Sequence, residues 1–134
     1  MKRLIPLLLV VLFAARAEAA VSYSYTLDSK SSRTTSSTGS TTAISKTIKA
    51  CAGRLTATNN SGTTPTLDAK IQYSPDGGTT WFDELSFTQV TTGSSNQVVH
   101  VDTTVTRQYY QVRSVVTLAG SSPNYNFTVY LDCE

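Results

Sequence analysis

Beyond residue 20 the chain shows no sustained helical periodicity. Short stretches rich in Thr, Ser, Val and Tyr alternate instead between apolar and polar side chains, and clusters of Gly, Pro and Asn interrupt them. A period of two is typical of a strand with one buried face, and turn clusters every 8 to 15 residues or so are typical of an all-β sandwich or barrel. The sequence therefore predicts an antiparallel β-sandwich, jelly-roll or Ig-like, of about seven to eight strands.

The first predicted strand, residues 20–28, has the most regular alternation. Its apolar face is formed by Val21, Tyr23, Tyr25 and Leu27. Residues 29–42 contain only Ser, Thr, Lys, Arg and Gly, so we expect a loop or flexible linker there. A strand on such a linker can pair within its own sheet or cross to the open edge of a neighbour, and we expect it to cross as an assembly strand. The sandwich core is predicted to occupy residues 43–134.

Further strands are predicted where apolar positions share a parity, within residues 43–58, 67–73, 81–87, 99–105, 110–118 and 125–131. A change of parity predicts a bulge or bend near Ala50. Residues 62–65 and 120–123 share a Gly-[Ser/Thr]-[Ser/Thr]-Pro pattern, and each leads into a strand. Because glycine and proline set the path of such loops, equivalent loops at one end of a sandwich explain this similarity as well as an internal duplication does.

The N-terminus has the three parts of a secretory signal. Lys2 and Arg3 precede an apolar run over residues 5–15, and Ala17-Glu18-Ala19 gives the small-x-small pattern of a cleavage site. The run is about half the roughly 20 residues of a membrane-spanning helix. We therefore expect residues 1–19 to be removed, no stable membrane span afterwards, and a secreted, cell-surface or periplasmic location.

Cleavage also changes the charge of the chain. The full sequence has 11 basic and 9 acidic residues, and removal of residues 1–19 leaves 8 of each because Lys2, Arg3, Arg16 and Glu18 are lost. A domain without net charge lacks the basic surface that binding to a nucleic-acid backbone requires. Nucleic acid is therefore not a predicted partner.

Two cysteines, Cys51 and Cys133, lie in the mature chain. An even number in an exported chain indicates a disulfide, and each cysteine shares the parity of neighbouring core positions. The bond is predicted to tie the second strand to the last. The long loop that it closes makes it worth roughly 4 kcal/mol in a chain-entropy account.

The sharpest motif is the sequence Ser-Pro-Asp-Gly-Gly-Thr-Thr-Trp at residues 74–81. It resembles the Asp-box, S-x-D-x-G-x-T-W, of sialidases and many unrelated β proteins, where it is a folding element away from the catalytic centre. Asp76 can accept N–H groups across the turn, the glycines allow a positive φ, and Trp81 can pack on the hairpin. A structural turn is predicted, formed by Ser74, Asp76, Gly78, Thr80 and Trp81.

Residues 61–131 show a wider resemblance. The features are G-T-x-P before a strand, S-x-D-G-x-x-T-W, F-x-Q-V-T, R-Q-Y-Y-Q-V-R and a final G-x-S-P-x-[YF]-x-[FY]. This set resembles small β-sandwich proteins from the structural modules of tailed phages. The resemblance implies a β-sandwich with an assembly or surface-coat role. The signal peptide and the cysteine pair are departures of this chain from that pattern.

Four aromatic residues are predicted to face away from the core, two by parity and two from a consecutive pair: Phe82, Tyr109, Tyr110 and Tyr130. Exposed aromatic rings on a sandwich can stack on sugar rings. They can equally pack at a sheet edge or form a self-association face. The four residues are therefore a candidate binding face with both uses open.

The sequence contains no recognisable catalytic constellation. Its one histidine, His100, lies between two inward-facing valines, and no G-x-S-x-G motif occurs. Asp83 and Glu84 are adjacent in a strand and so point to opposite faces. The acidic residues also lack the spacing of a calcium loop. We therefore expect a protein that is not an enzyme and has no metal site and no cofactor.

These features together predict a secreted, non-catalytic structural or surface-coat subunit that assembles with itself. The alternative prediction is an extracellular module that binds carbohydrate or another cell-surface ligand.

Overall fold

The protein is described by a computed structural model that covers residues 22–44, 50–101 and 111–134. Every regular element in these ranges is a β-strand, and all strand pairs are antiparallel, which confirms the predicted fold class. None of these residues forms a helix long and apolar enough to cross a membrane. The strands are β1 (Tyr23–Arg33), β2 (Ser37–Thr38), β3 (Thr42–Ala43), β4 (Cys51–Ser74), β5 (Phe82–Ser86), β6 (Ser94–His100) and β7 (Gln111–Cys133).

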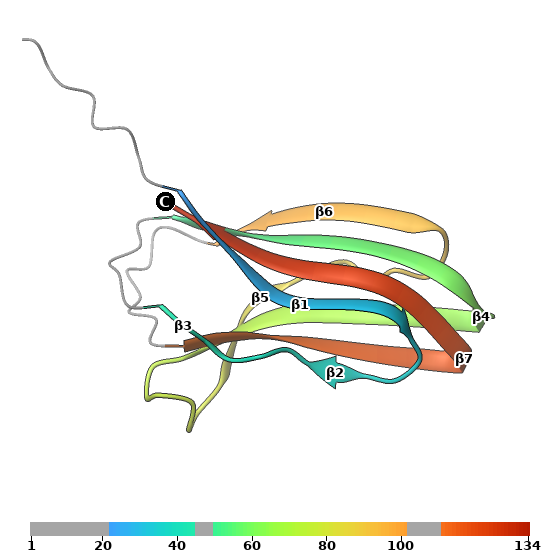
Figure 1. The fold of residues 1–134 in the computed structure, drawn as a ribbon, viewed down its shortest axis with the longest axis horizontal. Helices are drawn as coiled ribbons and strands as arrows, with labels where there is room; N and C mark the ends of the chain where they lie inside the picture. The colour runs from blue at the N-terminus through green and yellow to red at the C-terminus, as the bar shows by residue number, and fades with distance from the viewer. Residues whose placement is uncertain (1–21, 45–49, 102–110) are drawn as a thin grey trace, which may run out of the picture.

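The centre of the fold is a long ribbon made by β4 and β7. The two strands pair from Cys51↔Cys133 at one end to Ser74↔Gln111 at the other. The ribbon folds over in the middle, so that its two halves lie in two layers (Figure 1). The first half of β4 lies between β6 and the end of β7, with β1 beyond, whereas the second half lies between β5 and the start of β7, with β2 and β3 beyond.

The fold in the ribbon coincides with the two similar glycine-proline segments. Register shifts between Asn59 and Thr66 interrupt the pairing there. Gly62 and Gly120 have φ values of 134° and 97°, outside the range that other residues adopt readily. The segments cross so closely that a Cβ on Gly120 would lie 2.4 Å from the carbonyl oxygen of Thr64. The similar segments therefore lie together at one end of the sandwich, where they turn both strands from one layer into the other.

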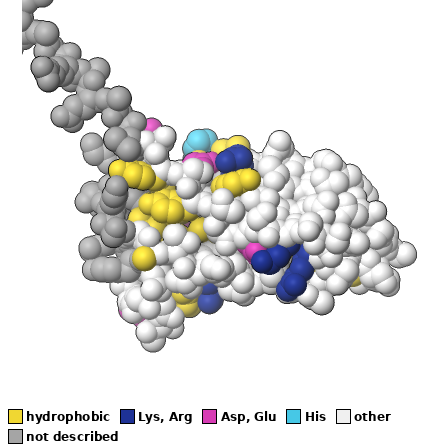
Figure 2. Space-filling model, in the orientation of Figure 1, with side chains coloured by type: hydrophobic (Ala, Val, Ile, Leu, Met, Phe, Trp, Pro, Cys, Tyr) yellow, Lys and Arg dark blue, Asp and Glu magenta, His cyan; other side chains and the backbone are white. Residues whose placement is uncertain are grey.

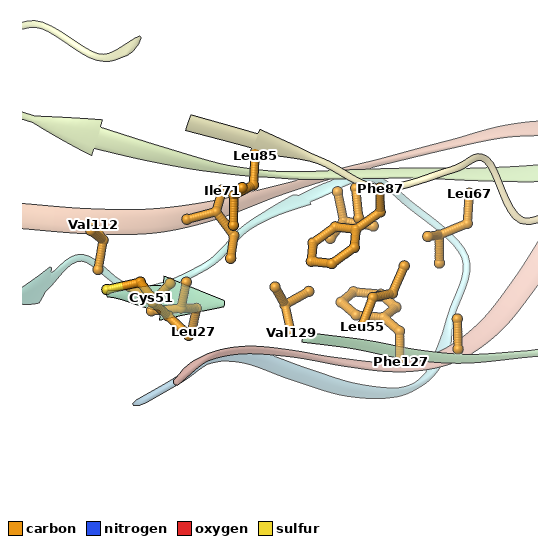
Figure 3. Close-up of a cluster of buried hydrophobic side chains, with 14 of the residues drawn as sticks. Leu27, Cys51, Leu55, Leu67, Ile71, Leu85, Phe87, Val112, Phe127 and Val129 are labelled. Carbon is orange, nitrogen blue, oxygen red and sulfur yellow. The ribbon is translucent and has the colours of Figure 1, made fainter. Parts of the chain in front are cut away.

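The core fills the space between the layers (Figure 3). Alternate residues of the ribbon supply most of it, as the period of two predicts. Tyr125 is the largest fully buried side chain, and its hydroxyl donates a hydrogen bond of 3.0 Å to the carbonyl oxygen of Val90. The buried aliphatic and aromatic residues include Leu27, Leu55, Leu67, Ile71, Leu85, Phe87, Val112, Val116, Phe127, Val129 and Leu131.

The predicted disulfide is confirmed. Cys51 and Cys133 are directly paired across the ribbon, their Cα atoms lie 4.1 Å apart, and both side chains are buried. The bond therefore closes the open end of the ribbon, opposite the fold at its middle. Just beyond it, Ala50 and Glu134 exchange backbone hydrogen bonds of 3.3 and 2.9 Å. The bulge predicted near Ala50 borders residues 45–49, which lie outside the described residues.

Residues 29–42 differ from the predicted loop or linker. β1 continues to Arg33, and β2 and β3 pair with the first half of β7. Side chains add to these contacts: the Ser37 hydroxyl donates a hydrogen bond of 2.8 Å to the buried Asp28. Backbone hydrogen bonds form whatever the side chains are, so a polar segment can line the side of a sandwich without any apolar pattern.

In the single molecule of this structure β1 pairs with its own β7, one of the two arrangements that the sequence left open; crossing to a neighbour stays a prediction. Tyr23 lies opposite Cys133 and Tyr25 opposite Leu131, and Leu27 is buried in the core. The physical reason is the paired segment that follows β1, because it holds the strand against its own β7. Val21 lies outside the described residues.

Candidate functional sites

The turn at residues 74–81 is organised by two side chains. The buried Ser74 hydroxyl donates to Asp76 Oδ1 at 2.7 Å and accepts a hydrogen bond from the Gly78 N–H, also at 2.7 Å. Asp76 Oδ1 in turn accepts the N–H groups of Thr79 and Thr80, at 3.1 and 2.8 Å. The carboxylate therefore satisfies the backbone donors of a turn that lacks its own strand partners.

These donors stabilise the ionised form of Asp76. Hydrogen bonds from the Thr80 side chain and backbone, then from Ser74 and Thr79, lower the pKa of Asp76 from 3.8 to about 2. The indole of Trp81 closes the turn, donating through Nε1 to the Gly78 carbonyl at 3.0 Å. Gly77 and Gly78 have φ values of 75° and 98°. All five residues predicted for a structural turn thus lie in it. The Asp76 carboxylate is bound to N–H groups of the turn itself.

Replacement of Asp76 by alanine should lower the thermal unfolding midpoint at pH 7 by several degrees. A folded-state pKa below the unfolded one means that the carboxylate stabilises the fold above about pH 4 and loses this effect as the pH falls toward 2. The difference between the variant and the original chain should therefore shrink over that range, as differential scanning calorimetry would show. Asp68→Ala is the control, because it removes a carboxylate that accepts hydrogen bonds from the Gln89 side chain and not from turn amides. A pH-independent difference would contradict this account.

A polar chain crosses the outer face of the layer that contains β5. Arg113 donates to Gln72 at 3.0 Å, Gln72 donates to Asp83 at 2.7 Å, and Lys70 lies 2.9 Å from the other Asp83 oxygen. The hydrogen bonds from Gln72 and Lys70 lower the pKa of Asp83. The Arg113 guanidinium also lies 4.0 Å from the centre of the Trp81 ring, so this chain holds the turn against the sheet. The carboxylate has structural partners on both oxygens.

Within residues 22–44, 50–101 and 111–134, no group of three His, Cys, Asp or Glu side chains is placed to hold a metal ion. His100 lies exposed at the end of β6, opposite Ala52. These positions supply no converging acid and base.

The structure separates the aromatic residues predicted to form one face. Phe82 was expected opposite the core by parity, but a register shift between Ile71 and Gln72 places it across from Tyr73. The two rings stack with centroids 5.6 Å apart, and Phe82 stays 47% exposed. Tyr130 lies in the other layer, with the Arg54 guanidinium 3.9 Å from its ring centre. The predicted Tyr109 and Tyr110 lie outside the described residues.

The Arg54 side chain is fixed from two directions. Its Nε lies 3.2 Å from Asp132, which also accepts a hydrogen bond from the Ser24 hydroxyl. Because the guanidinium stacks on Tyr130, one face of that ring is covered by the protein itself. Tyr130 is thus less available for a sugar than its parity alone indicated.

Sequence reasoning missed a shallow groove on the outer face of the layer that contains β6. Its volume is about 330 Å³, and most of the residues that line it carry a hydroxyl or an amide. Several of these groups already have partners within the protein: Thr58 and Ser94 lie 3.2 Å apart, and Thr128 lies 3.1 Å from the Ser29 hydroxyl. On the side of the molecule seen in Figure 2, charged side chains are few. The lining includes Lys30, Thr56, Thr58, Asn96, Asn126 and Thr128.

No family model matches the chain, and no curated protein matches it. Among solved structures, it is similar to a chain in the structure of infectious bursal disease virus, Gx strain, with a TM-score of 0.55 and 14% identity over 84% of this chain. A chain of the Gt strain structure gives a TM-score of 0.49 and 15% identity over 85% of this chain. The protein spans 31% of the length of each. At this identity the likeness concerns the fold, a β-domain found in a virus; neither structure is from a tailed phage.

Proposed function

We propose that this chain is an exported, non-catalytic structural or surface-coat subunit that associates with copies of itself. The observation that carries the proposal is a sandwich with open sheet edges: among the described residues, each layer has an outermost strand on both sides instead of closing into a barrel. Open edges present backbone donors and acceptors to other chains. The resemblance to structural modules of tailed phages, which includes the Asp-box-like turn, supports the same proposal, because it implies an assembly or surface-coat role.

Rigidity supports this role. The disulfide closes one end of the central ribbon, and the glycine-proline segments cross closely at its middle. In the turn at residues 74–81, the Asp76 carboxylate binds backbone N–H groups of the turn itself. A disulfide is kept in an oxidising compartment, in agreement with the expected signal peptide and export. The fold likeness to a chain of a virus structure is also in line with a subunit that functions in an assembly.

The proposal is tested by sedimentation of the oxidised chain from residue 20 onward, over a wide range of concentrations. We expect the weight-average mass to rise with concentration, because association through backbone edges follows mass action. Isolation of the protein from its host should also show a mature N-terminus at Ala20 or Val21. A monomer at every concentration would contradict self-assembly.

A second candidate function, binding of carbohydrate or another cell-surface ligand, is favoured by the hydroxyl- and amide-lined groove. Such groups are suited to the hydroxyls of a sugar. A glycan array probed with the mature protein separates the two candidates: binding that is lost in Asn126→Ala while sedimentation stays monomeric would favour this one.

A further inference from the structure

The outermost strands of the two layers differ in their protection against other chains. β1 has register shifts between Thr26 and Asp28 and between Lys30 and Arg33, and it carries the buried charge of Asp28. β5 has five residues and includes two acidic ones, and β2 and β3 have two residues each. Bulges, inward charges, acidic side chains and short length are the devices by which natural sheets prevent edge-to-edge pairing.

β6 has none of these devices. It runs for seven residues, Ser94–His100, without proline, lysine, arginine or an acidic residue. Its pairing with β4 is continuous from Ala52↔His100 to Thr58↔Ser94. Val98 is 59% exposed, more than any other large hydrophobic side chain among the described residues. β6 is therefore a straight, uncharged edge with an apolar side chain near its middle.

The hydrogen bonds to β4 show which backbone groups of β6 face outward. The Val101 N–H bonds to Cys51, and the Asn59 N–H bonds to Gly93, each at 2.8 Å. Residues in an antiparallel pair alternate between bonding the partner strand and pointing away from it. The odd-numbered residues of β6 therefore bond to β4. The N–H and C=O groups of residues 94, 96, 98 and 100 point to the free edge.

The inner face of β6 is held in place. The Gln97 side chain accepts the Thr88 N–H and donates to the Thr88 carbonyl, both at 2.8 Å. This pair of bonds links β6 to the segment after β5, across the side of the sandwich. The edge is thus ordered before any partner arrives, which lowers the entropy cost of pairing.

We propose that β6 pairs antiparallel with β6 of a second copy, about a twofold axis at Gln97. This inference deepens the proposed self-assembly by assigning its interface. The register places residue 94 opposite 100 and residue 96 opposite 98 of the second copy, so that all the outward backbone groups bond. Val98 then lies directly across from Asn96 of the second copy and diagonally across from its Val98, all on the same sheet face.

Charge and topology favour two copies, not an open filament. The mature chain carries 8 basic and 8 acidic residues once 1–19 are removed, so no net repulsion opposes the approach. Pairing through the same strand in both copies is isologous and uses up that edge. The joined sheet ends at β1 on both sides, where the bulges interrupt further pairing. The expected assembly is a dimer with one sheet continuous across both copies.

Two variants test the pairing by sedimentation of the mature, oxidised chain. Val98→Lys places like charges diagonally across the axis, and Asn96→Pro removes an outward N–H, a change that an edge strand tolerates. Each should raise the dimer dissociation constant by at least about tenfold, as 1.4 kcal/mol would. Thr128→Lys adds the same charge two strands from the edge and should leave dimerisation unchanged. Circular dichroism should show that all three fold.

Amide exchange locates the interface independently. As concentration rises, the amides of residues 96 and 98 should exchange more slowly, while the outward amides of β1 should not change. Association that is insensitive to both β6 variants, or protection that appears on β1, would overturn this inference and leave self-assembly standing. A chain that is monomeric throughout would overturn the proposed function as well.

Discussion

Replacing Cys51 and Cys133 together by alanine should lower the free energy of unfolding by roughly 2–5 kcal/mol. The bond closes a loop of 82 residues, and a loop of that length restricts the unfolded chain strongly. It also joins β4 and β7 where the ribbon begins, so the variant loses the covalent link between these two strand ends. Urea denaturation of the mature chain, followed by tryptophan fluorescence, would measure the loss.

The double substitution avoids leaving one buried thiol without its partner. Unfolding of the original chain under reducing conditions provides the matched control and should give a similar loss of stability. If the reduced chain and the double variant were as stable as the oxidised chain, the disulfide would have no part in holding the ribbon closed.

Gly120→Ala should cost about 3 kcal/mol or more. A residue with a Cβ is strained at positive φ, typically by 1–3 kcal/mol, and Gly120 has a φ of 97°. The added carbon would also lie 2.4 Å from the Thr64 carbonyl oxygen and 2.9 Å from Pro65 Cα, both of them backbone atoms that cannot turn away. The two strands would have to separate at the point where they change layers. The same urea denaturation measures this loss.

Gly93 offers the matched comparison. Its φ is 66°, but a Cβ there would meet no atom within 4 Å. Gly93→Ala should therefore cost only about 1 kcal/mol, through backbone strain alone. Equal losses of stability in the two variants would mean that the close approach of the two glycine-proline segments is not what makes a glycine necessary at residue 120.

Side-chain alternation predicted most of the core and the disulfide, because the buried positions of a strand are every second residue and are mostly apolar. Leu67, Ile71, Phe127 and Val129 are buried as their parity indicates. The pairing of residues 29–43 with β7 leaves no such pattern, because it depends on backbone groups that every residue shares. The fusion of predicted strands into the long β4 and β7 was missed for a related reason: the glycine-proline segments that predict loops are here folds within paired strands.

The candidate sites show the same limit. Residues 74–81 could be assigned to a turn because Asp76, the glycines and Trp81 each have a chemical reason to be there. Phe82 is exposed as predicted, but its position across from Tyr73 depends on a register shift that parity does not reveal. The open edge at β6 could not be predicted, since it depends on which strand lies outermost and on the phase of its hydrogen bonds. Neither is a property of the local sequence.

The pairing of Tyr23 with Cys133 has a mechanical consequence. The start of β1 and the end of β7 lie side by side and run in opposite directions (Figure 1). A force that pulled these two ends apart would break the hydrogen bonds between β1 and β7 one after another, starting at Tyr23. Because each step breaks only a few bonds, β1 would separate at low force. The disulfide would then carry the tension between β4 and β7, so the ribbon would stay closed. A subunit stretched in this way would lose β1, then β2 and β3, and would keep the part of its fold that follows Cys51.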